Sequence, residues 1–126
     1  LCKFLLQNSQ SEDLSILSLT LRVIFNLFNA MKGHLKVQLE VFLISVHLRI
    51  AESSSASHLN EHKELALESL LDFCREPALM LDLYTNYDCD FRCTNLFETL
   101  CKCLCRCAIP SISDEPKMTL TSLHLL

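Results

Sequence analysis

The chain has 126 residues, a formal net charge of −4 and a hydrophobic share of 50%. That share excludes general disorder, and the negative charge gives no electrostatic basis for binding nucleic acid or for docking directly on anionic lipid. One glycine and three prolines are too few turn residues for an all-β domain. The totals therefore predict an all-α chain.

The first predicted helix spans 12–31. Its apolar residues recur at steps of three and four, which places them on one face. This face comprises Leu14, Leu17, Leu21, Ile24, Phe28 and Met31. Ser9 and Glu12 have the spacing of a capping box at the start of the helix. Gly33 stands where a helix end favours a left-handed residue.

The segment 35–51 is also predicted as a helix, although its first seven residues alternate as in a strand. At about 100° per residue, its apolar side chains form two opposed stripes. One stripe comprises Leu35, Leu39, Phe42, Leu43, Val46 and Ile50, and the other comprises Val37, Val41, Ile44 and Leu48. A helix that is apolar on two sides is expected to lie between neighbouring helices, as in a helical solenoid.

The rest of the chain predicts a serine-rich connector at 52–59, helices at 60–75, 77–84 and 91–108, and a loop at 110–117. Asp90 is predicted to cap the helix 91–108, and Met118 is predicted to open a further helix. The helices pair with a period of roughly 40 residues, close to that of HEAT and armadillo repeats. We therefore expect one helical segment, 1–126, made of stacked antiparallel helix pairs in an armadillo/HEAT-like α-solenoid fragment.

The chain ends and its hydropathy lead to expectations about location. The sequence opens at Leu1 in the middle of a pattern and without methionine, so we expect part of a larger protein. No signal peptide opens it, which favours a cytosolic chain with reduced thiols. The most apolar stretch, 41–50, contains His47 and Arg49, so no membrane-spanning segment is predicted.

The sequence His58-Leu59-Asn60-Glu61-His62 matches the inverted zinc-peptidase motif H-x-x-E-H. That chemistry needs both histidines one turn apart on a helix, together with a third ligand. Here the motif lies across the connector and the start of a predicted helix, which favours a chance arrangement of polar residues.

Four of the eight cysteines alternate from Cys101 to Cys107. On a helix, only Cys101 with Cys105 and Cys103 with Cys107 share a face, and two thiolates do not complete a four-ligand zinc site. We expect Cys103 and Cys107 to extend the inward stripe of Leu96, Leu100 and Leu104, and Cys101 and Cys105 to be exposed. No cofactor or metal is predicted; a cysteine-rich metal-binding or redox-sensing helical protein is the alternative.

The pentapeptide Asn86-Tyr87-Asp88-Cys89-Asp90 lies between two apolar predicted helices. It combines an amide, a phenol, a thiol and two carboxylates. Asn and Asp side chains bond readily to nearby backbone, which favours a helix-breaking loop, and a specific binding role is the second interpretation.

This pentapeptide is identical to the homology-upstream box of the large, brefeldin-A-related Arf guanine-nucleotide exchange factors. The flanking residues 83–85 and 93–98 resemble the Golgi subclass, and the segments 21–23, 34–40 and 63–68 resemble the same region of those proteins. The resemblance covers about 14–110. Arg92, the alternating cysteines and the connector depart from the family pattern.

The resemblance implies a non-catalytic, homology-upstream (HUS) region of stacked helices that precedes a catalytic exchange domain absent from this chain. It implies contact with the N-terminal dimerisation domain of the same protein, within or between molecules, through Asn86, Tyr87, Asp88, Cys89 and Asp90. It also implies Golgi vesicle trafficking, a cytoplasmic protein held peripherally or indirectly at Golgi membranes, and Arf or Rab family GTPases as further candidate partners.

Overall fold

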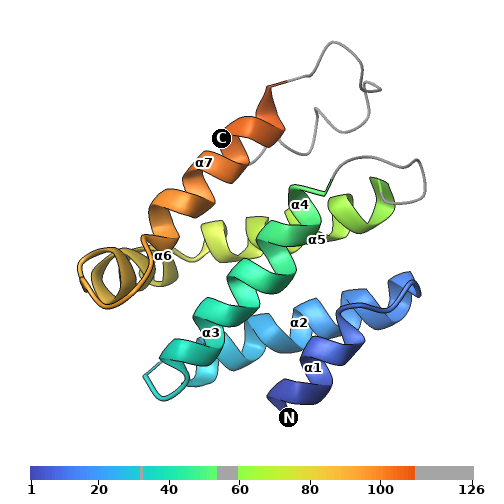
Figure 1. The fold of residues 1–126 in the computed structure, drawn as a ribbon, viewed down its shortest axis with the longest axis horizontal. Coiled ribbons are helices and arrows are strands. Elements are labelled where there is room, and N and C mark those ends of the chain that lie inside the picture. The colour runs from blue at the N-terminus through green and yellow to red at the C-terminus, as the bar shows by residue number, and fades with distance from the viewer. Residues whose placement is uncertain (32, 54–59, 110–126) are drawn as a thin grey trace.

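The computed structural model of the chain is all-helical over the residues it describes, which are 1–31, 33–53 and 60–109. The α-helices, drawn in Figure 1, are α1 (Cys2–Asn8), α2 (Leu14–Met31), α3 (Lys36–Phe42), α4 (Arg49–Ala51), α5 (Asn60–Arg75), α6 (Pro77–Leu83) and α7 (Leu96–Ala108). A π-helical turn, Leu43–Leu48, joins α3 to α4, and a second, Tyr84–Asp88, extends α6. The all-α prediction is confirmed, and α1 is a helix that the sequence reasoning missed.

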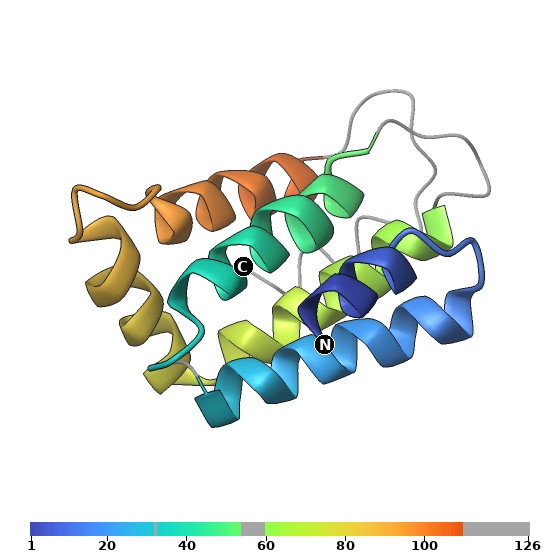
Figure 2. The ribbon, with the colours of Figure 1, turned by 60° about the horizontal axis from the view of Figure 1, so that its bottom comes forward.

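The helices form two layers (Figure 2). In one layer α1, the continuous helix from α3 to α4, and α7 lie on the same side of α2 and α5. Helix α5 packs against α2, α4 and α6, and α7 packs against α6 and both π-helical turns. The connector between α4 and α5 and the predicted segments beyond Ile109 lie largely outside the described residues. The layers agree with stacked helix pairs, while a solenoid remains a prediction.

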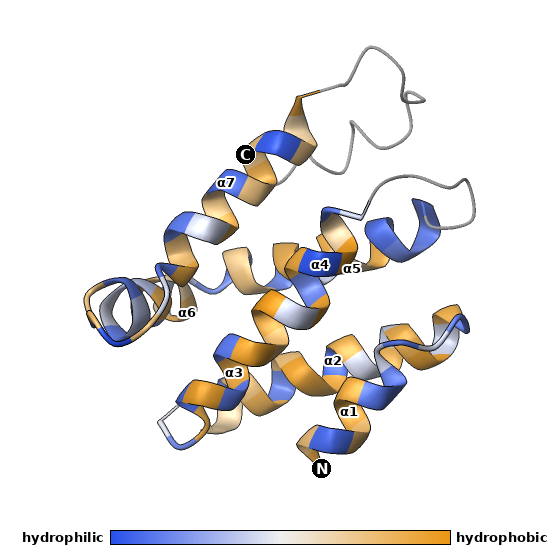
Figure 3. Cartoon of the chain, viewed as in Figure 1, coloured by the Kyte–Doolittle hydropathy of each residue, from blue (hydrophilic) through white to orange (hydrophobic). Residues whose placement is uncertain are grey.

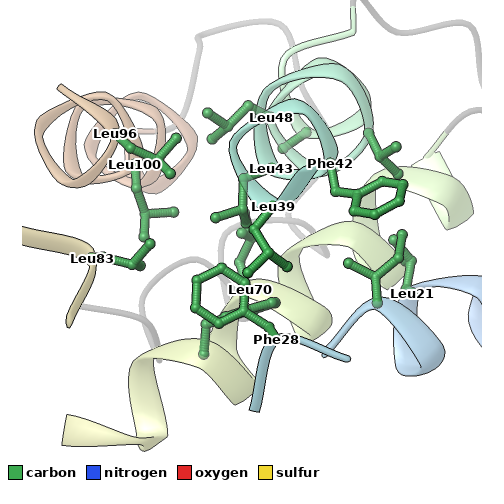
Figure 4. Close-up of a cluster of buried hydrophobic side chains, with 14 of the residues drawn as sticks. Leu21, Phe28, Leu39, Phe42, Leu43, Leu48, Leu70, Leu83, Leu96 and Leu100 are labelled. Carbon is green, nitrogen blue, oxygen red and sulfur yellow. The ribbon is translucent and has the colours of Figure 1, made fainter. Parts of the chain in front are cut away.

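The core lies between the two layers (Figure 4). Leu39, Phe42 and Leu43 face Leu70, Leu21 and Phe28 across the interface, and Leu83, Leu96 and Leu100 fill the end beside α6. Phe73 of α5 is completely buried and makes edge-to-face contacts with Phe25 and Phe28. Such aromatic pairs add to the stabilisation from burial itself.

His47 is completely buried, alongside the buried polar residues Thr20 and Ser69. Its Nε2 lies 3.0 Å from Ser69 Oγ and its Nδ1 lies 3.5 Å from the Phe42 carbonyl oxygen. Its ring also meets Phe73 edge-on. Complete burial lowers the pKa of His47 to about 4, because the charged imidazolium would lose its hydration.

The predicted signals at the two ends of α2 were wrong. Asp13, rather than a Ser9–Glu12 box, caps the helix: its Oδ1 accepts hydrogen bonds from the N–H groups of Ser15 (2.8 Å) and Ile16 (3.4 Å). Ser9 instead ends α1, where its hydroxyl donates to the Leu6 carbonyl. Gly33 has no positive φ, because the Met31 carbonyl accepts from the N–H groups of His34 and Leu35 in an ordinary turn.

The segment 35–51 is helical as predicted, but the prediction that it is buried on two sides was wrong. Val37, Val41 and Ile44 are 66%, 41% and 39% exposed, and within the second stripe Leu48 alone is buried. The physical reason is that the polar edge containing Lys36 and Glu40 faces the chain before α7 and hydrogen bonds to it. The Val37 side therefore faces outward.

The strongest membrane-like hydropathy belongs to α2 and not to 41–50. The 18 residues Leu14–Met31 have a mean hydropathy of 1.5, long and apolar enough to cross a membrane by length and composition alone. Figure 3 shows apolar and polar residues alternating along α2 and α3, in contrast to the polar start of α5. The sequence prediction of no membrane-spanning segment was argued from 41–50 and overlooked α2, whose polar residues are mostly uncharged. Core helices of soluble proteins meet the same test, and the inner face of α2 belongs to the core.

Candidate functional site

The chain leaves the helix within the pentapeptide Asn86–Asp90, which we call the box. Asn86 to Asp88 end the π-helical turn, and Cys89 and Asp90 follow it. The Cys89 N–H donates to the Tyr84 carbonyl at 3.1 Å, five residues back, which is the π-helical pattern. Tyr87 is turned inward and is 3% exposed. Its hydroxyl donates to the Lys36 carbonyl at 2.8 Å, and burial raises its pKa well above the ordinary value. Tyr87 thus ties the end of α6 to the start of α3.

Asp88 caps α7 although it belongs to the box and not to the residues directly before that helix. Its Oδ1 accepts from the Phe97 N–H at 2.8 Å and its Oδ2 accepts from the Glu98 N–H at 2.9 Å. Both N–H groups belong to the first turn of α7, where a helix has no acceptors of its own. A carboxylate there also interacts favourably with the helix dipole. Asp88 therefore fixes where α7 begins and how it leaves α6.

Asp90 does not cap a helix as predicted, since α7 begins at Leu96 and not at residue 91. Its carboxylate accepts from Lys36 Nζ at 2.9 Å and from the Arg92 backbone and side chain at 3.0–3.1 Å. Hydrogen bonds from Arg92 and then from Lys36 hold the pKa of the Asp90 carboxyl well below its usual range. Local bonding of this kind closes a turn, and it holds the chain on α3 before α7 can start.

A second tether joins α3 to the same turn. Glu40 Oε1 accepts from the Thr94 N–H at 2.9 Å and also from the Thr94 hydroxyl. Lys36 Nζ in addition lies 5.5 Å from the centroid of the Tyr87 ring, a distance at which cation–π attraction operates. The sequence alone did not identify Lys36 and Glu40 as partners of the box and of the turn after it, some fifty residues away.

The outward side of the box consists of Asn86 and Cys89. Both side chains are exposed, and Asn86 borders a small pocket with Phe28, Gly33 and Lys36. Tyr87, Asp88 and Asp90 make internal hydrogen bonds. Of the five predicted site residues, these three are therefore held in place, and Asn86 and Cys89 are exposed to solvent. The arrangement offers hydrogen bonding and surface contact. Its carboxylates are occupied by N–H donors.

The cysteines of α7 lie on the faces predicted for them. Cys103 is completely buried in line with Leu96, Leu100 and Leu104, Cys107 is half-buried, and Cys101 and Cys105 are exposed. All the cysteines within the described residues are free thiols. Within the same residues, no group of three or more His, Cys, Asp or Glu side chains is arranged to hold a metal ion.

Only the second half of the H-x-x-E-H motif lies within the described residues. His58 lies outside them, Glu61 is exposed in the first turn of α5, and His62 is half-buried. Glu61 and His62 line a groove with Ser45 and Arg49 of the neighbouring helix, and the predicted chance origin of the motif stays a prediction.

An all-helical scaffold whose box fastens α3, α6 and α7 to one another defines a structural and interaction segment. The chain matches a family model described as "Mon2/Sec7/BIG1-like, HUS domain" over residues 1–96. The chain belongs to this family, as the resemblance of the box predicted.

Relatives with established names agree with this assignment. The chain is 39% identical over 120 residues to the Caenorhabditis elegans "Golgi-specific brefeldin A-resistance guanine nucleotide exchange factor 1 homolog", covering 91% of the chain and 6% of that protein. It is 34% identical to the Arabidopsis thaliana "ARF guanine-nucleotide exchange factor GNOM", covering 97% of the chain and 8% of that protein. Identity to the Rattus norvegicus "Brefeldin A-inhibited guanine nucleotide-exchange protein 1" is 35%, covering 94% of the chain and 6% of that protein. The chain thus spans a small fraction of these relatives, and no solved structure matches it.

Proposed function

We propose that the chain is a non-catalytic regulatory and protein-interaction module of an Arf guanine-nucleotide exchange factor that acts in Golgi vesicle trafficking. Membership of the HUS-domain family and the names of the relatives support the proposal. Nucleotide exchange on Arf belongs, in this proposal, to another part of the longer protein. The protein is cytoplasmic and associates peripherally with Golgi membranes, and its membrane contact is indirect.

The partner we propose is the upstream dimerisation domain of the same protein, within one molecule or between two, with Arf or Rab family GTPases as further partners. One observation carries the proposal: Tyr87, Asp88 and Asp90 of the box make internal hydrogen bonds that fix its backbone, and Asn86 and Cys89 are exposed beside them. A side chain held on a packed corner loses little conformational entropy when a partner binds.

Apolar area for such a contact is available beside the box. Asn86 shares its pocket with Phe28 and Gly33, so the C-terminal end of α2 lies next to it. The outer side of α2 exposes Leu19 at 62% and Met31 at 42%. Two small side chains alone do not make a stable interface, which needs about 800 Å² per partner. The outer face of α2 supports the proposal because it extends the surface around Asn86.

The test is binding of the purified chain to the upstream dimerisation segment of its own protein, measured by titration calorimetry. Asn86→Ala and Cys89→Ala should each raise Kd by roughly tenfold, the equivalent of about 1.4 kcal/mol, while the melting temperature stays unchanged. Glu64→Ala on α5, also exposed, is the matched control and should bind as the wild type does. Unchanged Kd in both box variants would refute the proposed contact.

A further inference from the structure

A groove runs between α2 and α5 along the outer side of their layer. Leu14 and Glu61 line one end of the groove, and Phe25 and Asp72 line the other, so the two helices lie side by side and run in the same direction. The second layer of helices packs on the opposite side of α2 and α5 (Figure 2). Among the described residues, no helix therefore covers this groove.

The groove combines an apolar floor with an acidic wall. Three leucines provide the apolar surface, namely Leu14, Leu19 and Leu65, and the Leu19 side chain is 62% exposed. The wall consists of three exposed glutamates on α5, namely Glu61, Glu64 and Glu68. Their spacing of three and four residues places them in one row on the helix. They belong to the polar start of α5 in Figure 3.

The acidic row has no positive partner within the part of the chain that the structure describes. The ion pairs there use other carboxylates, which are those of Glu52, Asp72, Asp90 and Glu98. Arg22 and Arg75 line the far end of the groove, and Arg75 already pairs with Asp72. The end of the groove beside Leu19 is therefore negatively charged as well as apolar.

We propose that this groove is the docking site for a basic amphipathic helix of another protein. The apolar face of that helix lies on Leu19 and Leu65, and its Lys or Arg side chains pair with the glutamates of α5, as in other helix-in-groove complexes. The groove follows α2 from Leu14 to Asn26, a length of about 18 Å that accommodates a partner helix of about twelve residues. Leu19 lies about 18 Å along α2 from Met31, so the groove is distinct from the surface beside Asn86.

The charge of the groove selects this occupant over three others. Anionic lipid headgroups and nucleic acid would both be repelled by the glutamates. A two-fold dimer of this chain brings the same surface of two copies together, which would place one acidic row against the other. A basic helix, in contrast, neutralises the repulsion among the glutamates and covers the apolar floor in the same contact.

Fluorescence anisotropy with a labelled synthetic helix tests the proposal. The probe is a peptide of leucine, alanine and lysine at helical spacing, long enough to fill the groove, and its counterpart carries glutamate at each lysine position. We expect the lysine peptide to bind at least roughly tenfold more tightly than the glutamate peptide, and its binding to weaken as salt is added. Equal binding of the two peptides, or no binding of the lysine peptide, would overturn the proposal.

Two matched pairs of variants locate the bound peptide, with circular dichroism to check that each variant is folded. Glu64→Gln should raise Kd roughly threefold, whereas Glu98→Gln, at an exposed glutamate of α7, should leave it unchanged. Leu19→Asn should raise Kd roughly tenfold, whereas Val37→Asn, at a side chain that is 66% exposed, should not. A control that weakens binding as much as its groove variant would show that net charge or another apolar surface holds the peptide, and the proposal would be wrong.

The same variants distinguish this inference from the proposed function and from the other occupants. Glu64→Gln should leave binding to the upstream dimerisation segment unchanged, so either contact can fail without the other. The free chain should sediment as a monomer and should not co-sediment with vesicles that contain phosphatidylserine. A dimer or a vesicle complex that is lost in Leu19→Asn would assign the groove to a second copy or to lipid, and would refute a basic helix as its occupant.

Discussion

Replacing Asp88 by alanine should separate α7 from its cap without disturbing the apolar core. The substitution removes two hydrogen bonds, to the N–H groups of Phe97 and Glu98, and leaves the first turn of α7 partly unsatisfied. Loss of an N-terminal cap costs about 1 kcal/mol and loss of the charge–dipole interaction up to about 1 kcal/mol more. We therefore expect the free energy of unfolding to fall by about 2 kcal/mol.

The expected change in melting temperature follows from the length of the chain. An unfolding entropy of about 2.1 cal/mol/K per residue over 126 residues gives about 265 cal/mol/K, so 2 kcal/mol corresponds to a fall of roughly 7 °C. Asp88→Asn keeps one acceptor oxygen and should lose about half as much. Thermal and urea unfolding, followed by far-UV circular dichroism, measure both variants.

Asp72→Ala is the matched control for this prediction. Asp72 is an exposed carboxylate on α5 that pairs with Arg75 one turn away, and its removal should change the stability by less than about 0.5 kcal/mol. If Asp88→Ala melts within the error of Asp72→Ala, the capping role assigned to Asp88 is wrong. If partner binding falls in Asp88→Ala by no more than its loss of folded protein explains, Asp88 acts on binding through the fold alone.

Three further outcomes follow from the contacts of α3 and the π-helical turn after it. Tyr87→Phe loses the hydrogen bond to the Lys36 carbonyl and should destabilise the chain by about 1 kcal/mol in urea unfolding; an unchanged midpoint would contradict the tether. The pKa of His47 is lowered from 6.5 to about 4, so the unfolded state binds protons more readily between these values; stability should be complete above pH 6.5 and fall by about 3 kcal/mol as the pH drops to 4. His47→Gln should remove this dependence in stability curves recorded across that range. Val41→Lys should alter stability by less than about 0.5 kcal/mol, because the side chain is 41% exposed; a loss of several kcal/mol would restore the two-sided burial that the hydropathy pattern predicted.

Local rules were sufficient where a single helix face decides burial. The inward stripe of α7, including Cys103, was predicted from spacing alone and is buried. The first stripe of 35–51 was predicted in the same way: Leu39, Phe42, Leu43 and Val46 are buried, and Leu35 and Ile50 are partly buried. The same rule failed for Val37, Val41 and Ile44, because a hydropathy pattern shows that a side chain is apolar but not which neighbour covers it. Exposure there depends on which edge of α3 the turn before α7 contacts.

Helix boundaries near the box were the least predictable feature. Asp90 has the composition of a helix cap, and nothing in the sequence nearby shows that Lys36 will bind it instead. Asp88 looked like part of a loop and proved to be the cap of α7. In both cases several donors are within reach of the side chain along the chain, and the folded structure decides which one binds: Lys36 of α3 for Asp90, and the first turn of α7 for Asp88.

The sequence by itself determined that this protein is helical, which faces of its helices are apolar, and, through the box, which family it belongs to. These properties depend on residue type and on spacing within one element, because a helix sets its own periodicity. Only the tertiary structure decided that Tyr87, Asp88 and Asp90 face inward while Asn86 and Cys89 face outward. That division depends on hydrogen-bond partners that only the folded chain brings to the box: Lys36 lies about fifty residues from Tyr87 and Asp90, and the first turn of α7 lies nine and ten residues from Asp88.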